Sequence, residues 1–424
     1  MWRMLAGALM LVAAGFPEAA DVSGVPVLAD TMRLTLRQAE ALLHAHNLEL
    51  QLGRAALAGA TAEGVVAAQR PNPSLSLNTL SVSPSSGIGS GRPWDKQVDS
   101  TIRLDQLIER GGKRELRTSA AQMGIVASRS DLAELERQQR VALHAIYYDL
   151  LLAQERERVA LETVALCEQS LNEMRGQSDK LSSADYSRIN IDRLKTLNDV
   201  RQARAEREKA QLILAYSLGI EGDARRIEAA DSWPGNRQAE QGHSPEAILE
   251  TRHDVRAALA RLGAAGKIRD LARAQRARDV SVGVQYERNP AGDGNTYGVG
   301  ISIPLFINHF YEGEIERAEA GYLAAQLNLE RVRLLALAEV ARARSELDSA
   351  IERVQRYDTV LLRESHTAAA NAEDAYRRGA IAVMDLLDAR RTLYATRIEA
   401  EFARSEHAKS LAAWKAAIGE RNMR

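Results

Sequence analysis

The stretch VSVGVQYERNPAGDGNTYGVGISIPL, residues 280–305, decides the fold. Apolar side chains alternate in it with small or polar ones, and this period of two is typical of a β-strand with one apolar face. The apolar positions are Val280, Val282, Val284, Tyr286, Tyr297, Val299, Ile301, Ile303 and Leu305. Each of the two segments has about ten residues, which is the length of a tilted strand that crosses a bilayer. A soluble hairpin with one buried face is the alternative interpretation.

A second pair of β-like segments lies at residues 74–80 and 97–105. In the later segment, charged residues recur on the face opposite to the apolar one, at Asp99, Arg103 and Asp105. Charges in this position are expected where strands surround a water-filled lumen. The sequence therefore predicts two hairpins, each with an apolar face and a polar face.

Aromatic rings lie near the ends of the predicted strands, at Trp94, Tyr286 and Tyr297, as they do in the interfacial belts of membrane proteins. However, an open sheet of four strands leaves unpaired backbone groups at two edges, and hydrocarbon cannot satisfy them. We therefore expect a barrel that closes only when several copies assemble. The residues expected to face lipid are Val280, Val282, Val284, Val299, Ile301 and Ile303, and those expected to face the lumen are Asp99, Arg103 and Asp105.

The placement of proline predicts the remaining architecture. None of the ten prolines falls within residues 94–233 or 305–424. Because an interior proline costs a helix about 3 kcal/mol, two such tracts predict very long helices. Residues 113–175 alone would form a rod of roughly 90 Å. In the second tract, apolar residues recur every seven positions and predict a helical packing seam, at Val340, Leu347, Val354 and Leu361.

Each tract contains one plausible turn, at residues 176–184 and 378–383, so both are predicted to be helical hairpins. Corresponding features of the two halves lie about 200 residues apart, as Asp185 and Asp385 do. Such self-similarity indicates an internal duplication. The predicted units are repeat one at residues 33–220, a linker at 221–243 and repeat two at 244–419.

The N-terminus and the charge balance narrow the class of protein. Residues 1–29 are typical of a signal peptide, because Arg3 precedes an apolar run that is too short to span a bilayer. The chain has 56 basic and 57 acidic residues, so it lacks the basic footprint of a nucleic-acid-binding protein. Its single cysteine, Cys167, excludes a disulfide within the chain and a cysteine-based metal cluster.

Two motifs carry a resemblance to a known family. They are IERGGKR at residues 108–114 and YRRG at 376–379, the latter followed by VMDLLDA at 383–389. Together with the duplication, they make the chain similar to the TolC-like outer-membrane efflux proteins, and within these to the CzcC-type heavy-metal subgroup. The resemblance covers residues 30–424. It implies a mainly α fold with a small β part, in which a homotrimer forms a long-helix α-barrel in the periplasm and a twelve-stranded transmembrane β-barrel with four strands per protomer.

The resemblance also assigns roles at the second hairpin tip. In the family, two aspartates ring the narrow periplasmic entrance, and the matching residues are Asp385 and Asp388. A family tyrosine that matches Tyr376 bonds an aspartate of the other repeat, which here would be Asp185. The family's archetype has an arginine where this chain has Ile381, so one latch is expected to be absent or replaced. The alternative for Asp385 is an ordinary carboxylate at a helix N-terminus.

No catalytic or nucleotide-binding fingerprint occurs in the sequence, so we expect neither an enzyme nor a cofactor. His44 and His46 are two residues apart on a predicted helix and face different ways, and packing is expected for His309, so no metal site is predicted. The resemblance implies a passive channel for divalent heavy-metal cations in the outer-membrane lipid, served by a periplasmic adaptor protein and an inner-membrane RND-type pump. The alternatives are a multidrug or type I secretion channel of the same fold, and a secreted coiled-coil scaffold.

Overall fold

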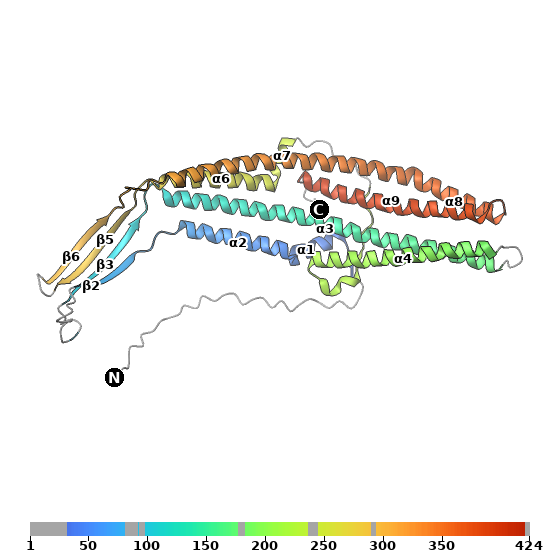
Figure 1. The fold of residues 1–424 in the computed structure, drawn as a ribbon, viewed down its shortest axis with the longest axis horizontal. Helices are drawn as coiled ribbons and strands as arrows, with labels where there is room; N and C mark the ends of the chain where they lie inside the picture. The colour runs from blue at the N-terminus through green and yellow to red at the C-terminus, as the bar shows by residue number, and fades with distance from the viewer. Residues whose placement is uncertain are drawn as a thin grey trace.

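The molecule is an elongated bundle of helices with a small β-sheet at one end (Figure 1). A computed structural model describes residues 32–80, 92, 98–176, 183–235, 245–289 and 294–419. The predicted signal peptide, residues 1–29, lies outside the described residues, as do Trp94 and parts of the predicted turn 176–184 and of the linker 221–243. Among the helices that the structure describes, none is long and apolar enough to cross a membrane.

The two halves of the chain contain the same order of elements. Each has a short helix, a longer helix, two strands and a helical hairpin. The first half comprises α1 (Leu36–His46), α2 (Leu48–Ala68), β2 (Ser74–Leu80), β3 (Asp99–Ile108), α3 (Lys113–Gly176) and α4 (Ser183–Leu218). The second comprises α5 (Pro245–Thr251), α6 (His253–Ala274), β5 (Val280–Asn289), β6 (Gly294–Ser302), α7 (Glu312–Arg356), α8 (Leu362–Arg377) and α9 (Val383–Ala417). Between the halves lie a 3₁₀ turn, Glu221–Arg226, and the short strand β4, Ile227–Ala229.

The lateral order of the helices matches that of the strands. Near the sheet, α2 packs on α3, α3 on α6 and α6 on α7. The strands follow the order β2-β3-β5-β6, and every neighbouring pair is antiparallel. Toward the other end of the bundle, α4 packs on α3, α3 on α9, and α9 on α7 and α8. The chain therefore forms a layer that stays about four elements wide along its whole length (Figure 1).

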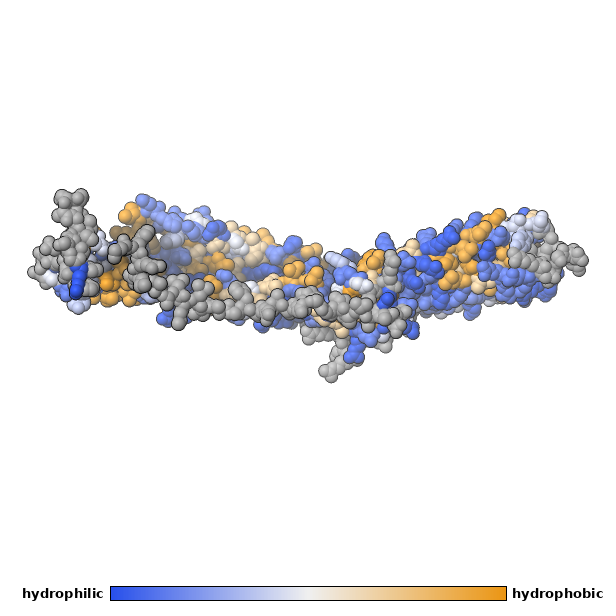
Figure 2. Space-filling model, turned by 90° about the horizontal axis from the view of Figure 1, so that it is seen from below, coloured by the Kyte–Doolittle hydropathy of each residue, from blue (hydrophilic) through white to orange (hydrophobic). Residues whose placement is uncertain are grey.

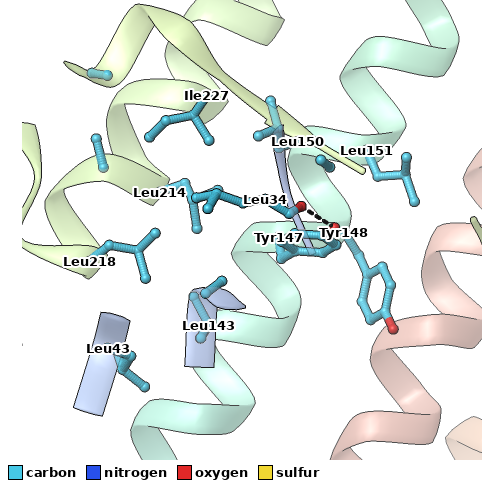
Figure 3. Packing of buried hydrophobic residues seen from close by; sticks show 14 of the residues in the cluster. Leu34, Leu43, Leu143, Tyr147, Tyr148, Leu150, Leu151, Leu214, Leu218 and Ile227 are labelled. Carbon is cyan, nitrogen blue, oxygen red and sulfur yellow. Dashed lines mark hydrogen bonds between the residues drawn. The ribbon is translucent and has the colours of Figure 1, made fainter. Parts of the chain in front are cut away.

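The largest hydrophobic cluster lies around α3, α4 and α1, with β1 (Met32–Leu34) and β4 packed against them (Figure 3). Tyr147 of α3 is fully buried there, and its hydroxyl donates a hydrogen bond to the carbonyl oxygen of Leu34 at 2.8 Å. Leu34 ends the three-residue strand β1, which pairs in parallel with β4. The start of the first half and the linker are thereby held together on the α3–α4 hairpin.

Each short helix ends at one residue with an extended backbone, and in the first half this residue also caps the next helix. Asn47 separates α1 from α2, and its side chain accepts a hydrogen bond from the Leu50 amide and donates one to the Ser217 carbonyl oxygen, both at 3.0 Å. In the second half, Arg252 separates α5 from α6 with a similar extended backbone. An asparagine side chain is well suited to such a cap because it can accept from one amide while donating elsewhere.

The predicted heptad seam of the second hairpin holds over part of its length. Leu347 and Val354 are buried, and Val340 packs against the cluster formed with α9. Leu361, however, is 38% exposed, because the segment Tyr357–Leu361 adopts a π-helical turn. Such a turn inserts an extra residue into the helix and rotates the following side chains away from the seam. The prediction for Leu361 was therefore wrong.

The links from the strands to the long helices contain residues with positive φ angles. Gly111 and Gly112 join β3 to α3 with φ angles of 72° and 70°. A Cβ atom on Gly111 would also lie 2.7 Å from the Cβ of Ala277, which is closer than real side chains approach. At the equivalent passage in the second half, Tyr311 has φ 63° before α7 begins. The GG pair of the first motif is thus required by both conformation and space.

Candidate functional site

The four-stranded sheet exposes its apolar face. Register places Leu104, Val284 and Val299 in one row across β3, β5 and β6, and Ile102 lies beside Tyr286 and Tyr297 in the next. Most of the large hydrophobic side chains of this face are 45–84% exposed, namely Leu75, Leu77, Ile102, Leu104, Val284, Tyr297, Val299 and Ile301, whereas Val280, Val282 and Tyr286 are partly buried. A soluble sheet would bury such a face. The alternative of a soluble hairpin with one buried face does not fit this exposure within the described residues.

The residues predicted to face lipid share this face, with one exception. Val280, Val282, Val284, Val299 and Ile301 occupy matching positions in the register of β3, β5 and β6. Ile303 lies one residue beyond the end of β6 at Ser302, and it is 46% exposed. Pro304 follows it and has no backbone N–H to extend the ladder. That Ile303 faces lipid stays a prediction. Figure 2 shows hydrophobic side chains gathered at the end of the molecule that carries the strands and in patches along the helices.

The opposite face of the sheet is polar. Arg103 and Asp105 lie on it, two residues apart on β3, and Arg103 donates hydrogen bonds to both carboxylate oxygens of Asp105, at 2.7 and 2.8 Å. Asp99 has the same parity on β3 and therefore lies on the same face. The structure thus brings together the charged side chains that the alternation assigned to one face.

The join between sheet and helices contains a buried ion pair that the sequence did not reveal. Lys113, the first residue of α3, is 5% exposed, and its ammonium group lies 2.8 Å from the carboxylate of Asp279. The same Asp279 oxygen accepts a hydrogen bond from the Arg110 amide at 2.9 Å. Asp279 belongs to the other half of the chain, so this contact ties the two halves together just above the sheet.

The two aspartates of the second hairpin tip lie at the end of the molecule that is far from the sheet (Figure 1). Asp385 and Asp388 are both exposed near the start of α9. Asp385 also accepts a hydrogen bond from the Ala382 amide at 3.2 Å, so it caps the first turn of its helix. This is the ordinary role weighed for Asp385, and it leaves the second carboxylate oxygen facing solvent.

The hydrogen bond that the resemblance implied for Tyr376 is not formed within the protomer. The Tyr376 hydroxyl is buried without a hydrogen-bond partner, and Asp185 instead pairs with Arg188 on its own helix at 3.3 Å. Burial, and next the negative charge of the nearby Asp185, raise the pKa of Tyr376. The tyrosine acts by packing: it covers a cluster of Leu171, Ile189, Val383 and Leu387, which joins the two hairpin tips.

Arginines of α9 connect the two hairpins, and their partners could not be predicted from the sequence. Arg390 donates to the Ser170 hydroxyl of α3 at 2.8 Å, and Arg391 pairs with Asp192 of α4 at 2.8 Å. Arg397 pairs with Glu162 of α3. The partners lie 199 to 235 residues away along the chain, so only the fold reveals the contacts.

The histidines weighed in the sequence make contacts with nearby side chains. His44 contacts Arg54 and Glu136, and His309 stacks near Tyr311 and approaches Glu314 at 3.1 Å. Across the part of the chain that the structure describes, there is no group of three or more His, Cys, Asp or Glu side chains that could hold a metal ion.

Comparison with solved structures shows which class this fold belongs to. The outer-membrane channel OprN is 23% identical in sequence, with a TM-score of 0.76 over 91% of this chain and 89% of OprN. CusC, described for its folding and transmembrane channel formation, is 18% identical, with a TM-score of 0.77 over 92% of each chain. The fold is therefore that of the outer-membrane channels, with a helical part and a membrane sheet.

Sequence comparison points to the same kind of protein. Residues 244–420 match the family model described as outer membrane efflux protein. The cobalt-zinc-cadmium resistance protein CzcC of Cupriavidus metallidurans is 24% identical over 312 residues, which cover 70% of this chain and 72% of CzcC. Residues 244–420 are therefore similar to outer membrane efflux proteins, and the whole chain has the fold of the outer-membrane channels.

Proposed function

We propose that three copies of this chain form the outer-membrane channel of a tripartite system for heavy-metal efflux. The observation that carries the proposal is the open sheet. Among the residues that the structure describes, its edge strands β2 and β6 have no partner strand on their outer sides, and its apolar face is exposed. In hydrocarbon, such edges must be paired. Pairing β6 of one copy with β2 of the next satisfies them, and three copies supply twelve strands.

The helical layer supports closure in the same way. Its lateral edges near the sheet are α2 and α7, which flank α3 and α6. Both edge helices expose large apolar side chains, namely Leu48, Leu52, Val65 and Val66 on α2, and Leu323, Leu327, Leu334 and Leu335 on α7. Apolar surface on two opposite edges favours a ring in which α7 of one copy packs on α2 of its neighbour. The helices then enclose a periplasmic tunnel that continues the barrel.

The hairpin tips form the periplasmic entrance in this proposal. Asp385 and Asp388 from three copies place six carboxylates around one aperture, where they attract cations. Asp99, Arg103 and Asp105 line the barrel lumen, and the valines of β5 and β6 face lipid. The tips, farthest from the membrane, meet a periplasmic adaptor protein, which links the channel to an inner-membrane RND-type pump. Duplication of one unit, at residues 33–220 and 244–419, accounts for the repeated order of elements.

Divalent heavy-metal cations are the proposed cargo. The support is the similarity to the cobalt-zinc-cadmium resistance protein CzcC. A wide water-filled channel needs no metal-binding site in its wall, and the energy for transport comes from the pump. Multidrug or type I secretion cargo is the competing assignment for the same fold.

A growth experiment tests the cargo. A strain that lacks this gene is compared with the same strain carrying the wild-type gene or the Ile301→Arg variant, on zinc, cobalt, cadmium and nickel salts and on a panel of hydrophobic drugs. We expect restored growth on the metal salts with the wild-type gene alone. Restored growth on the drugs but not on the salts would assign the channel to drug efflux.

A planar-bilayer measurement tests the channel itself. Protein purified from outer membranes in detergent is added to a lipid bilayer, and the current is recorded at constant voltage. Discrete steps of steady conductance are expected. Their absence from preparations that contain the assembled protein would overturn the proposal.

A further inference from the structure

The polar face of the sheet carries a feature that the proposed function leaves unexplained: an arginine that lies along the wall. Arg103 starts on β3 and crosses β5, where its Nη1 atom donates to the Gln285 side chain at 3.3 Å. Its guanidinium ends near β6, since a Cβ atom built on Gly300 would lie 3.0 Å from Nη2. The side chain therefore reaches across the sheet instead of standing away from it.

Glycines make this arrangement possible. In register, Asp105 of β3 lies beside Gly283 of β5 and Gly300 of β6, and Arg103 lies beside Gln285 and Gly298. A Cβ atom on Gly283 would overlap the Asp105 carboxylate and approach the Arg103 guanidinium at 3.1 Å. Any side chain at Gly283 would thus displace the pair. At these positions the glycine backbone carries no side chain, so Arg103 and Asp105 lie flat against the sheet.

The pair is also locally charge-neutral. The two central rows of the polar face contain Ser74, Asp105, Gly283, Gly300, Ser76, Arg103, Gln285 and Gly298. Arg103 and Asp105 are the charged residues among these eight. Their bidentate contact is the strongest geometry available to a guanidinium and a carboxylate, because two parallel N–H···O bonds fix both groups. With side chains 31% and 19% exposed, the pair lies partly covered against the wall.

We infer that the Arg103–Asp105 pair sets the ion selectivity of the barrel midsection by keeping three guanidinium groups neutralised and pressed against the wall. This inference rests on the proposed trimeric channel. Without Asp105, Arg103 would be free to extend into the lumen, and three copies would form a ring of positive charge that opposes the passage of cations. Without Arg103, three free carboxylates would attract cations. Because Gly283, Gly298 and Gly300 let the pair lie flat against the sheet, the lumen stays both wide and neutral at this level.

Single-channel recording tests the inference with four forms of the full chain: wild type, Asp105→Asn, Arg103→Gln and the double variant. Each is purified from outer membranes, its assembled mass is checked in detergent, and its reversal potential is measured across a potassium chloride gradient. Low salt is used because the Debye length is about 10 Å at 0.1 M, so that higher salt would screen the ring. Asp105→Asn preserves side-chain size closely, whereas Arg103→Gln removes the guanidinium and shortens the side chain, so the conductance of each variant is recorded to detect a change in pore width.

The two single variants should shift the reversal potential in opposite directions. Asp105→Asn should move it toward anion selectivity and lower zinc conductance, Arg103→Gln should move it toward cation selectivity, and the double variant should return close to wild type. Gly283→Ala, which displaces the carboxylate from the guanidinium, should shift selectivity in the direction of Asp105→Asn, whereas Gly298→Ala, which meets the neutral Gln285, should not. Conducting channels whose selectivity is the same in all variants would overturn the inference and leave the proposed channel intact. A wild-type protein that never conducts would overturn both.

Discussion

Lys113 and Asp279 are 166 residues apart in sequence, yet their side chains form an ion pair at 2.8 Å at the junction between the four-stranded sheet and the helices. Lys113 begins the long helix α3 of the first half, and Asp279 precedes strand β5 of the second. Because the ammonium group is almost fully buried, it depends on this carboxylate for its charge to be tolerated. The contact therefore fixes how the strands of both halves continue into their helices.

Replacing Asp279 with Ala should destabilise the junction by about 3 kcal/mol, because the buried Lys113 charge loses its partner and the Arg110 amide loses its acceptor. Less assembled protein should reach the outer membrane, and limited trypsin digestion should cut the purified protein near residues 108–114. The matched control is Asp270→Ala, which removes a surface ion pair worth less than about 1 kcal/mol. Equal losses in the two variants would contradict a special role for Asp279.

Arginine on the apolar face should block membrane insertion. Ile301→Arg places a charge on the exposed apolar face of β6, at a cost of about 2–4 kcal/mol near the bilayer midplane. Ser302→Arg is the control, since the next residue of the strand points to the polar face. Quantitative blotting of outer-membrane fractions measures both. If the two variants inserted equally well, the facing of the strand would be misassigned.

Gly300 is less tolerant of substitution than its place on the polar face of the strand suggests. A serine there would press on the Arg103 guanidinium, since a Cβ atom already lies 3.0 Å from Nη2. For this reason Ser302, and not Gly300, is the suitable control for the polar face.

The double substitution Asp385→Ala and Asp388→Ala should reduce the cation selectivity of the channel and its block by multivalent cations. Six carboxylates would be lost from the proposed entrance, and with them the field that concentrates cations there. Planar-bilayer recording with added cobalt or zinc measures the block. Asp374→Ala, on the neighbouring helix α8, is a control for general loss of acidic charge near the tip. Unchanged selectivity and block in the double variant would mean that both aspartates are ordinary residues at a helix N-terminus and do not control the entrance.

Tyr376→Phe should leave the resting conductance unchanged and should not lower stability. The hydroxyl is buried without a hydrogen-bond partner, a state that costs about 1–3 kcal/mol, and phenylalanine keeps the packing against the tip cluster. Tyr376→Ala should instead loosen the tips, because the ring covers apolar side chains of both hairpins. Conductance of the isolated channel and its thermal unfolding measure the two effects. A higher conductance in the phenylalanine variant would show that the hydroxyl makes a bond in the assembly.

Local patterns predicted most of the fold. Alternation located β5 and β6 to within a few residues because one face is uniformly apolar, and the absence of proline located the long hairpins. The π-turn at Tyr357–Leu361 escaped prediction because a regular heptad carries no sign of an inserted residue. The three-residue pair β1–β4 escaped because so short a strand has no measurable period.

The candidate sites were less predictable, because they depend on contacts between the two halves of the chain. Parity alone placed Arg103 and Asp105 on one face, but the glycines under them come from β5 and β6. Nothing in the neighbourhood of Lys113 or Arg391 indicates Asp279 or Asp192 as a partner. The bond implied for Tyr376 came from the resemblance, and the described chain shows the hydroxyl buried without a partner.

The central claim is that three copies close one membrane barrel through the edges β2 and β6. Its most direct test is the mass of the protein after gentle extraction from outer membranes in a mild detergent, measured by light scattering with the detergent subtracted, before and after heating. We predict a mass of three protomers before heating and of one protomer afterwards. A single protomer in the unheated, membrane-extracted sample would contradict the claim.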